Sequence, residues 1–321
     1  MKTLLTVCLC TLGIALVLGG AYRILLLEDW SSYPNAAAAA APQQEGFSQT
    51  QPFLLRRDDQ CYDDFYAAVY SRIHYSCAKD DDNDNETFVQ YHVNAVVDAT
   101  QADRAHAAIL DVGCGSGDIV EAFAREGFRA YGLDKSAAMI DECRRARQAG
   151  AYKIGDVLDP MCYDAHSFTH ILLVNQMIYS FNKKQRQDML RICRTWLKNS
   201  GGYLVVHVID FDNQEKNVGG GVGGGANVGS TLEIDETGFL YNGKRISAAA
   251  EAAADVTVTA LETFVDKPSG HVRRHEKQMF IESQRKVVSA VKTAGFSVLA
   301  KISLRPLAIR NQYLYIFEKS I

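Results

Sequence analysis

The stretch Ile109-Leu110-Asp111-Val112-Gly113-Cys114-Gly115-Ser116-Gly117 decides the fold of this chain. It joins the end of an apolar run to three glycines at alternate positions, and a helical pattern begins directly after it. Such glycines let the backbone bend sharply and approach a ligand, while the N-terminus of the following helix offers unpaired N–H groups. The stretch therefore predicts a ligand-binding turn between a strand and a helix.

The spacing separates this turn from other glycine-rich loops. A dinucleotide fingerprint requires its third glycine at the position of Asp118. A P-loop requires Gly-Lys-Ser/Thr, which is absent from the stretch. A nucleophile elbow, G-x-S-x-G, fails because Cys114 stands where the glycine before Ser116 should be.

Outward from this stretch, short apolar runs alternate with helical periods, as in a mostly parallel sheet covered by helices. Strands are predicted at Ala107–Val112, Arg129–Leu133, Tyr152–Ile154, Ile171–Val174, Tyr203–Ile209, Phe296–Leu304 and Tyr313–Phe317. Helices are predicted at Ile119–Glu126, Ser136–Arg147, Lys183–Lys198 and Ser283–Ala294. We therefore expect an α/β fold with a seven-stranded, mostly parallel, doubly wound sheet.

An acidic residue, Asp134, ends the second predicted strand, and Gly155-Asp156 closes the third. Together with the glycine turn, these residues resemble the motifs of class I S-adenosylmethionine-dependent methyltransferases. The similarity extends over about residues 107–210, and the final helix and two strands match the family's closing hairpin. The resemblance implies a Rossmann-like sheet whose last strand is antiparallel. It also implies S-adenosyl-L-methionine as the cofactor, lying across the ends of the first and second strands.

The resemblance assigns the glycine turn to the methionine part of the cofactor. Gly113, Cys114, Gly115 and Gly117 would form the turn beneath it, and Asp111 would lie close to its amino group. An ordinary structural role is the alternative, since a carboxylate in this place can simply stabilise the loop.

Four further residues match the ribose and adenine positions. Asp134, followed by Lys135, matches the carboxylate that accepts hydrogen bonds from both ribose hydroxyls. Asp156 and Val157 match the pair at the edge and face of the adenine. Asp134 as a helix-capping residue and Asp156 as a turn residue are the structural alternatives.

Two regions are assigned to the methionine and acceptor side. Asn175 and Gln176 follow the fourth strand and would lie beside the sulfonium. Aromatic residues at helical spacing in Cys61–Tyr75, Tyr70 among them, resemble the N-terminal helix that covers the cofactor in many small-molecule methyltransferases. Core packing alone would also explain that stripe.

The catalytic residues are not identified by any motif, because methyl transfer depends mainly on alignment of the nucleophile with the methyl group. His207, Tyr179 and His275 are the weak candidates for a base or an acceptor anchor. A lone histidine is more often structural.

The chain is divided by composition into three parts. Residues 1–27 are predicted to be a transmembrane anchor, with a cleaved secretory signal as the alternative, because the apolar run contains one charge, Arg23. Residues 28–59, with six consecutive alanines, are predicted to be a low-complexity tether. Residues 60–321 form the expected methyltransferase domain, with a β-rich cap inserted at about 211–281.

Charge and cysteine content narrow the function. A net charge of -4 makes nucleic acid an unlikely partner, because such binding depends on a basic surface. The cysteines form no C-x-x-C pair, so no metal site is expected. The expected activity is methyl transfer to oxygen or nitrogen of a small-molecule or lipid-like acceptor at a membrane. The alternatives are an RNA or protein methyltransferase and a non-catalytic cofactor-binding module.

Overall fold

The computed structural model describes residues 46–47, 51–75, 88–147, 149–211, 231–236, 238–245, 256–307 and 309–320. The predicted membrane segment at residues 1–27 and most of the predicted tether lie outside this part of the chain. Among the described residues, no helix combines the length and the apolar character that a membrane span requires.

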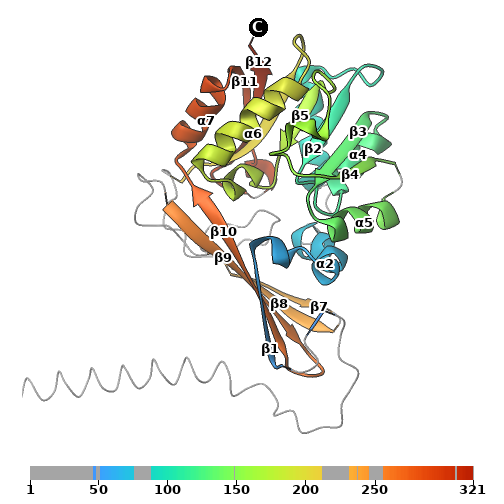
Figure 1. Ribbon diagram of the computed structural model, residues 1–321, viewed down its shortest axis with the longest axis vertical. Helices are drawn as coiled ribbons and strands as arrows, with labels where there is room; N and C mark the ends of the chain where they lie inside the picture. The colour runs from blue at the N-terminus through green and yellow to red at the C-terminus, as the bar shows by residue number, and fades with distance from the viewer. Residues whose placement is uncertain are drawn as a thin grey trace, which may run out of the picture.

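The predicted seven-stranded sheet is confirmed, in the order β11-β12-β6-β5-β2-β3-β4 (Figure 1). Its strands are β2 (Ala108–Val112), β3 (Arg129–Asp134), β4 (Ala151–Ile154), β5 (His170–Leu173), β6 (Tyr203–Ile209), β11 (Phe296–Ser303) and β12 (Gln312–Lys319). The pairs among β2 to β6 are parallel, whereas β12 runs antiparallel to both β6 and β11. The expected antiparallel last strand is therefore present.

Helices cover both faces of this sheet, and each face carries its own apolar core. Helices α6 (Lys183–Trp196) and α7 (Gln284–Thr293) contribute Trp196 and Val287 to one core. Helices α3 (Phe88–Thr100), α4 (Asp118–Arg125) and α5 (Ala137–Ala146) contribute to the other. The predicted helices begin and end within two residues of the observed ones, but α3 is absent from the predicted elements.

A second sheet of five strands lies beside the first, in the order β1-β10-β9-β8-β7. Its strands are β1 (Phe53–Arg57), β7 (Thr231–Glu236), β8 (Phe239–Arg245), β9 (Val256–Asp266) and β10 (Val272–Ile281). Strands β7 to β10 fall within the insertion at about residues 211–281 that was predicted to be β-rich. Strand β1 was not predicted, because its residues were assigned by sequence to the tether.

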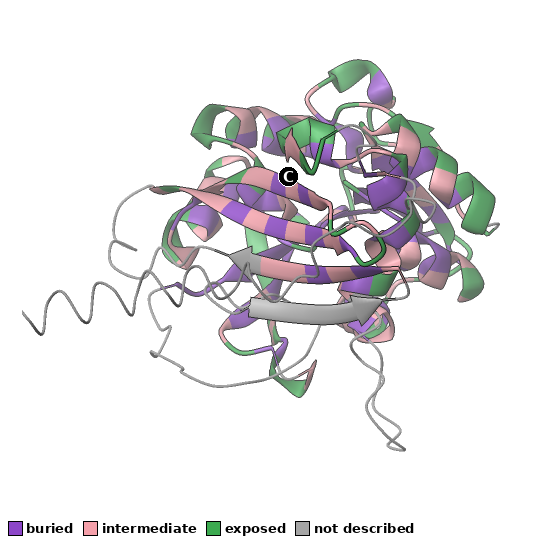
Figure 2. Ribbon diagram, turned by 90° about the horizontal axis from the view of Figure 1, so that it is seen from below, coloured by how far each residue is buried: buried purple, intermediate pink, exposed green. Residues whose placement is uncertain are grey.

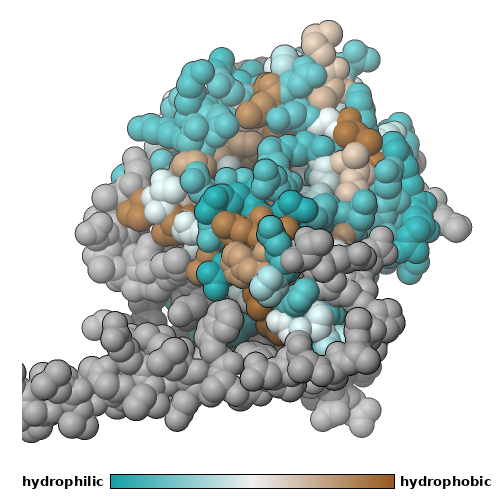
Figure 3. Space-filling model, turned by 60° about the horizontal axis from the view of Figure 1, so that its bottom comes forward, coloured by the Kyte–Doolittle hydropathy of each residue, from teal (hydrophilic) through white to brown (hydrophobic). Residues whose placement is uncertain are grey.

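Helix α2 (Asp64–Tyr75) lies between the two sheets (Figure 1). Phe65 on α2 packs edge-on against Phe239 on β8 and Phe264 on β9, with ring centroids 5.8 and 5.2 Å away. Buried and half-buried residues alternate along β9, so one face of the second sheet is covered by α2 (Figure 2). Among the coloured residues that come forward in Figure 3, apolar side chains lie between hydrophilic ones. The helix predicted near Cys61–Tyr75 is thus present, and it joins the second sheet to the first.

Candidate active site

The strand order of the large sheet reverses between β2 and β5. From β2 the chain proceeds outward through β3 and β4, whereas β5 and β6 lie on the other side of β2. In open α/β sheets, ligands bind outside the carboxyl ends of the strands at such a reversal. The loops that leave β2 and β5 there carry Gly113 and Asn175, both predicted site residues.

The glycine turn has the backbone conformation that glycine allows most easily. Gly113, Gly115 and Gly117 have φ values of 70°, 53° and 77°. The backbone N–H groups of Gly113 and Cys114 both donate to the carbonyl of Leu133 on β3, at 2.7 and 3.2 Å. The loop is therefore fixed to the neighbouring strand before α4 begins.

Two predicted site residues direct their side chains away from the loop surface. The buried Cys114 side chain lies toward β3, because its Sγ would be 2.7 Å from a Cβ added at Gly132. The Lys135 Nζ forms an ion pair with Asp59, 2.6 Å from its Oδ2. Cys114 thus presents its backbone to the loop, and the ammonium of Lys135 is engaged on η1 (Asp58–Cys61).

Asp134 connects the end of β3 to the glycine turn. Its Oδ2 accepts a hydrogen bond from the Gly115 N–H at 3.0 Å, and its Oδ1 accepts one from the Ser136 N–H at 2.9 Å. Burial raises the pKa of Asp134, and these backbone hydrogen bonds oppose that shift. A carboxylate has about four acceptor sites. Each oxygen therefore retains capacity for a ligand hydroxyl, as the ribose assignment requires.

Asp111 is the clearest sign of a ligand at this edge of the sheet. It is 4% exposed, and its Oδ1 has no hydrogen-bond partner among the described residues. Burial and, to a lesser degree, the charge of Asp134 raise its pKa well above the ordinary value. A buried polar atom without a partner is costly. An ammonium group bound there would remove that cost, so the site fits the amino group of S-adenosylmethionine.

Asp156 and Val157 lie in the turn after β4. Asp156 Oδ1 accepts a hydrogen bond from the Leu158 N–H at 2.9 Å, so the carboxylate does shape its own turn. Val157 is 4% exposed and belongs to the core on the α6 face of the sheet. The turn is joined to β3 by a hydrogen bond from the Gly155 N–H to the Asp134 carbonyl at 2.9 Å. The ribose and adenine candidates are thus adjacent.

The loop after β5 has a strained backbone. Asn175 and Gln176 have φ values of 49° and 65°, a left-handed region that non-glycine residues rarely adopt and that is enriched at functional sites. Directly after them, Met177 lies over the glycine turn, since its Sδ would be 2.6 Å from a Cβ added at Gly113. The structure therefore brings these residues together with the turn.

Tyr70 reaches the same turn from helix α2. Its Cε1 would lie 3.3 Å from a Cβ added at Gly115, so the ring is close to the loop backbone. Tyr70 is half-buried, which leaves part of the ring accessible beside the turn. The predicted proximity of this helix to the cofactor loop is thus observed, and its role as a cover remains a prediction.

Two of the three candidate catalytic residues are buried, His207 on strand β6 of the large sheet and Tyr179 on η4 (Met177–Ser180), which packs against that sheet. His207 is 1% exposed, and its Nε2 lies 2.8 Å from the Gln312 Oε1 on the adjacent strand β12. The hydroxyl of the fully buried Tyr179 accepts a hydrogen bond from the Ile209 N–H at 3.0 Å. Both side chains have structural partners, which agrees with the structural alternative rather than with contact to an acceptor.

His275 is also fully buried, in the second sheet. Its Nε2 accepts a hydrogen bond from Arg273 Nε at 2.7 Å, and its Nδ1 lies 3.5 Å from Glu262 Oε2. Burial lowers the pKa of His275 despite the nearby Glu262 carboxylate. These contacts place the ring within a polar cluster and not at an open surface.

Sequence reasoning missed several side chains, one at the turn and two on the second sheet. Met177 follows two predicted residues and had no motif to mark it. Glu262 and Lys277 lie on β9 and β10, and only their position on the covered face of a strand pair distinguishes them from solvent-exposed charges. Strict alternation along those strands is the signal that could have indicated their burial.

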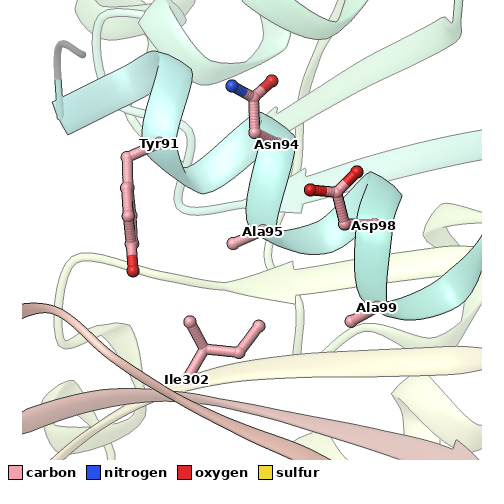
Figure 4. Close-up of a pocket in the computed structure, with 6 residues that line it drawn as sticks. All are labelled: Tyr91, Asn94, Ala95, Asp98, Ala99 and Ile302. Carbon is pink, nitrogen blue, oxygen red and sulfur yellow. The ribbon is translucent and has the colours of Figure 1, made fainter.

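A separate hollow of about 490 Å³ lies between α3 and β11 (Figure 4). It is lined by Tyr91, Asn94, Ala95, Asp98, Ala99 and Ile302. Three strands separate β11 from β2 in the sheet, which corresponds to about 19 Å at the usual spacing. The hollow is thus distinct from the glycine turn. No group of three or more His, Cys, Asp or Glu residues suited to a metal occurs in the described part of the chain.

Comparison with known proteins gives a family and a set of similar structures. A family described as a methyltransferase domain matches residues 109–201. The CcbJ methyltransferase from Streptomyces caelestis has a TM-score of 0.58 and 16% identity, covering 81% of this chain and 98% of that one. The sugar N-methyltransferase KedS8 from a Streptoalloteichus species has a TM-score of 0.56 and 13% identity, covering 90% of this chain and 100% of that one.

A third structure was determined with S-adenosylmethionine bound. It is CalS10 from Micromonospora echinaspora, described as an amino pentose methyltransferase involved in calicheamicin biosynthesis. Its TM-score is 0.54 and its identity 17%, covering 80% of this chain and 97% of that one. At such identities the likeness establishes a shared fold. A search of curated protein sequences finds no match.

Proposed function

We propose that this chain, whose residues 109–201 match a family of methyltransferase domains, is a class I S-adenosylmethionine-dependent methyltransferase that methylates a polar, amine-bearing small molecule related to amino sugars. S-adenosyl-L-methionine is the cofactor. The sequence left oxygen and nitrogen acceptors, and small-molecule and lipid-like acceptors, open. The proposal selects a nitrogen on a polar acceptor.

The observation that carries this choice is the polar and aromatic character of the cluster that contains Tyr70, the residue of α2 that reaches the glycine turn. Tyr62 and Tyr70 are half-buried, and the side chains of His74 and Lys277 are 23% and 17% exposed. Aromatic faces combined with hydrogen-bonding groups suit a compact, hydroxylated molecule better than an acyl chain. The names of two similar structures, a sugar N-methyltransferase and an amino pentose methyltransferase, point to the same class of acceptor.

The residues of the chain contribute binding and orientation. Bound S-adenosylmethionine supplies an activated methyl group on a sulfonium. The Asp111 carboxylate would accept hydrogen bonds from the ammonium of the cofactor, and the Asp134 carboxylate would accept them from its ribose hydroxyls. The glycine turn lets the backbone approach the cofactor closely. Tyr70 and Met177, on either side of the turn, restrict the approach of water and of the acceptor. Such positioning is the main requirement of an in-line methyl transfer.

The test uses the purified full chain in detergent with methyl-labelled S-adenosylmethionine. Amino sugars, the corresponding sugars with a hydroxyl in place of the amine, and fatty acyl acceptors are compared under identical conditions. We expect label in the amino sugars, and we expect Asp111→Asn to reduce it. Label confined to acyl acceptors, to RNA or to protein would refute the proposal.

We also propose that the domain is held at a membrane by residues 1–27, as a single-pass anchor. The supporting observation is the apolar run Leu4–Leu27 with its single charge. The full chain should stay in the membrane pellet after alkaline carbonate extraction, and a variant lacking residues 2–27 should be released. An N-terminus starting near Ala21 in the mature protein would instead establish a cleaved signal and entry into the secretory pathway.

A further inference from the structure

A buried carboxylate on the second sheet, that of Glu262, contacts side chains of helix α2 and of neighbouring strands in the same sheet. Glu262 is 8% exposed, and its Oε1 accepts hydrogen bonds from the hydroxyls of Tyr66, at 2.9 Å, and Tyr241, at 3.2 Å. Its Oε2 lies 2.6 Å from Lys277 Nζ. None of these groups is required by the cofactor assignments above.

The electrostatic surroundings keep this carboxylate ionised. Burial alone would raise the pKa of Glu262, but the Lys277 ammonium and the contact with His275 outweigh it and hold the pKa well below the usual range. His74 on α2 adds a further contact, with its Nε2 3.6 Å from the carboxylate. A buried charge with this many partners is fixed in one geometry.

The partners on α2 flank the residue that reaches the glycine turn. Tyr66, Tyr70 and His74 are spaced by four residues and therefore share one face of the helix. The Tyr70 ring is edge-on to Tyr66 at 5.4 Å between centroids and lies 4.3 Å from the His74 ring. Tyr66 and His74 also contact each other, since the Tyr66 hydroxyl is 3.0 Å from His74 Nε2. Tyr70 is thus held between two side chains that Glu262 orders.

The apolar contacts of α2 serve a different purpose. Phe65 packs on Phe239 and Phe264, and these contacts attach the helix to the second sheet without involving Glu262. Apolar packing is not directional, whereas hydrogen bonds to a fixed carboxylate define the rotation of the helix about its axis. That rotation determines where Tyr70 lies over Gly115.

We propose that Glu262 is a positioning residue for cofactor binding, acting through Tyr66 and His74 to hold Tyr70 against the glycine turn. The inference rests on the proposed function, because it takes the turn to be the cofactor site. This role makes the second sheet a part of the cofactor site. A ligand bound against that sheet and the cofactor would then change each other's affinity through α2.

The test is a double-mutant cycle on the full chain, with S-adenosylhomocysteine as the calorimetric probe. Glu262→Gln preserves the shape and removes the charge, and Tyr70→Ala removes the side chain through which it acts. We expect each single variant to weaken binding on the order of tenfold, and the double variant to be no weaker than Tyr70→Ala alone. The matched control is Asp266→Asn, which alters another fully buried carboxylate of β9 whose contacts are to Ser269 in the hairpin turn.

The outcomes are separable. Independent, multiplicative losses in the double variant would overturn the positioning role, and so would a Glu262→Gln protein that melts at lower temperature but binds the probe like the wild type. An equal loss of binding in Asp266→Asn would show a general effect of destabilising the sheet and would also overturn it. A wild-type chain that fails to bind the probe would refute the proposed function itself.

Discussion

Replacing Asp134 by asparagine tests whether this side chain serves ligand binding or only the stability of the loop. The carboxylate accepts hydrogen bonds from the N–H groups of Gly115 and Ser136. An asparagine has one acceptor oxygen, and its NH₂ group cannot accept from the second N–H. One backbone donor therefore loses its partner, and one of the two acceptors available to the ribose becomes a donor.

The magnitude follows from the kinds of hydrogen bond that are lost. A hydrogen bond to a charged group contributes about 1.5–3 kcal/mol, so loss of one ribose contact should weaken cofactor binding roughly 10- to 150-fold. Stability should change less. Burial raises the pKa of Asp134, which means that burying its charged form costs free energy. Asparagine does not carry that cost, so its absence partly offsets the lost backbone hydrogen bond.

The assay pairs calorimetric titration of S-adenosylhomocysteine with thermal unfolding of the same protein. Asp141→Asn serves as the control, because that carboxylate is 70% exposed on α5 and pairs with Arg144 on the same helix. We expect unchanged affinity in the control and the stated loss in Asp134→Asn. A folded Asp134→Asn protein with wild-type affinity, or one that loses stability while its affinity is unchanged, would show that Asp134 serves the loop alone.

Two further predictions concern other buried charges. At pH values below the raised pKa of Asp111, the free protein releases a proton when this carboxylate pairs with a cationic ligand. Cofactor affinity should therefore rise with pH above 3.8 until the pH exceeds the raised pKa of Asp111. Calorimetry in two buffers of different ionisation enthalpy measures the proton release. An affinity that does not change with pH would contradict the prediction. Glu282→Gln should lower the free energy of unfolding by about 3 kcal/mol, since it leaves the 2% exposed Arg186 without its charged partner. A melting temperature within about 2 °C of the wild type, where roughly 6–12 °C is expected, would show that the carbonyls bonded to Arg186 suffice.

The large sheet could be predicted from sequence because its signals are local. Strand β2 is buried at every residue and is followed at once by the glycines. Ser136, where the next helix was predicted to begin, caps α5 with its Oγ accepting a hydrogen bond from the Met139 N–H. Each of these features occupies a few consecutive residues. The resemblance carried by the glycine turn and Asp134 then implied that the ends of the first and second strands would be neighbours.

The second sheet could not be predicted to the same extent, because its pairings are between distant segments. Phe53 on β1 pairs with Val272 on β10, and nothing in the five residues of β1 identifies that partner. Glu262 and Lys277 look like surface charges in sequence, and they become a buried pair only when α2 covers that face of the sheet. Side chains whose role depends on tertiary cover have no local pattern to reveal them.

Buried charge rather than open volume distinguishes the site that we propose for the ligand. The hollow beside α3 is roomy, but its one ionisable carboxylate, Asp98, lies on a partly exposed helix face where water solvates it well. At the glycine turn, by contrast, the fold buries Asp111 beside Asp134, and Asp111 Oδ1 has no hydrogen-bond partner among the described residues. An unpartnered buried oxygen costs stability in the free protein, and we expect a cation with hydroxyl groups to recover that cost on binding. A neutral ligand of the same shape would not recover it, so we expect the turn to favour a charged nucleoside such as S-adenosylmethionine.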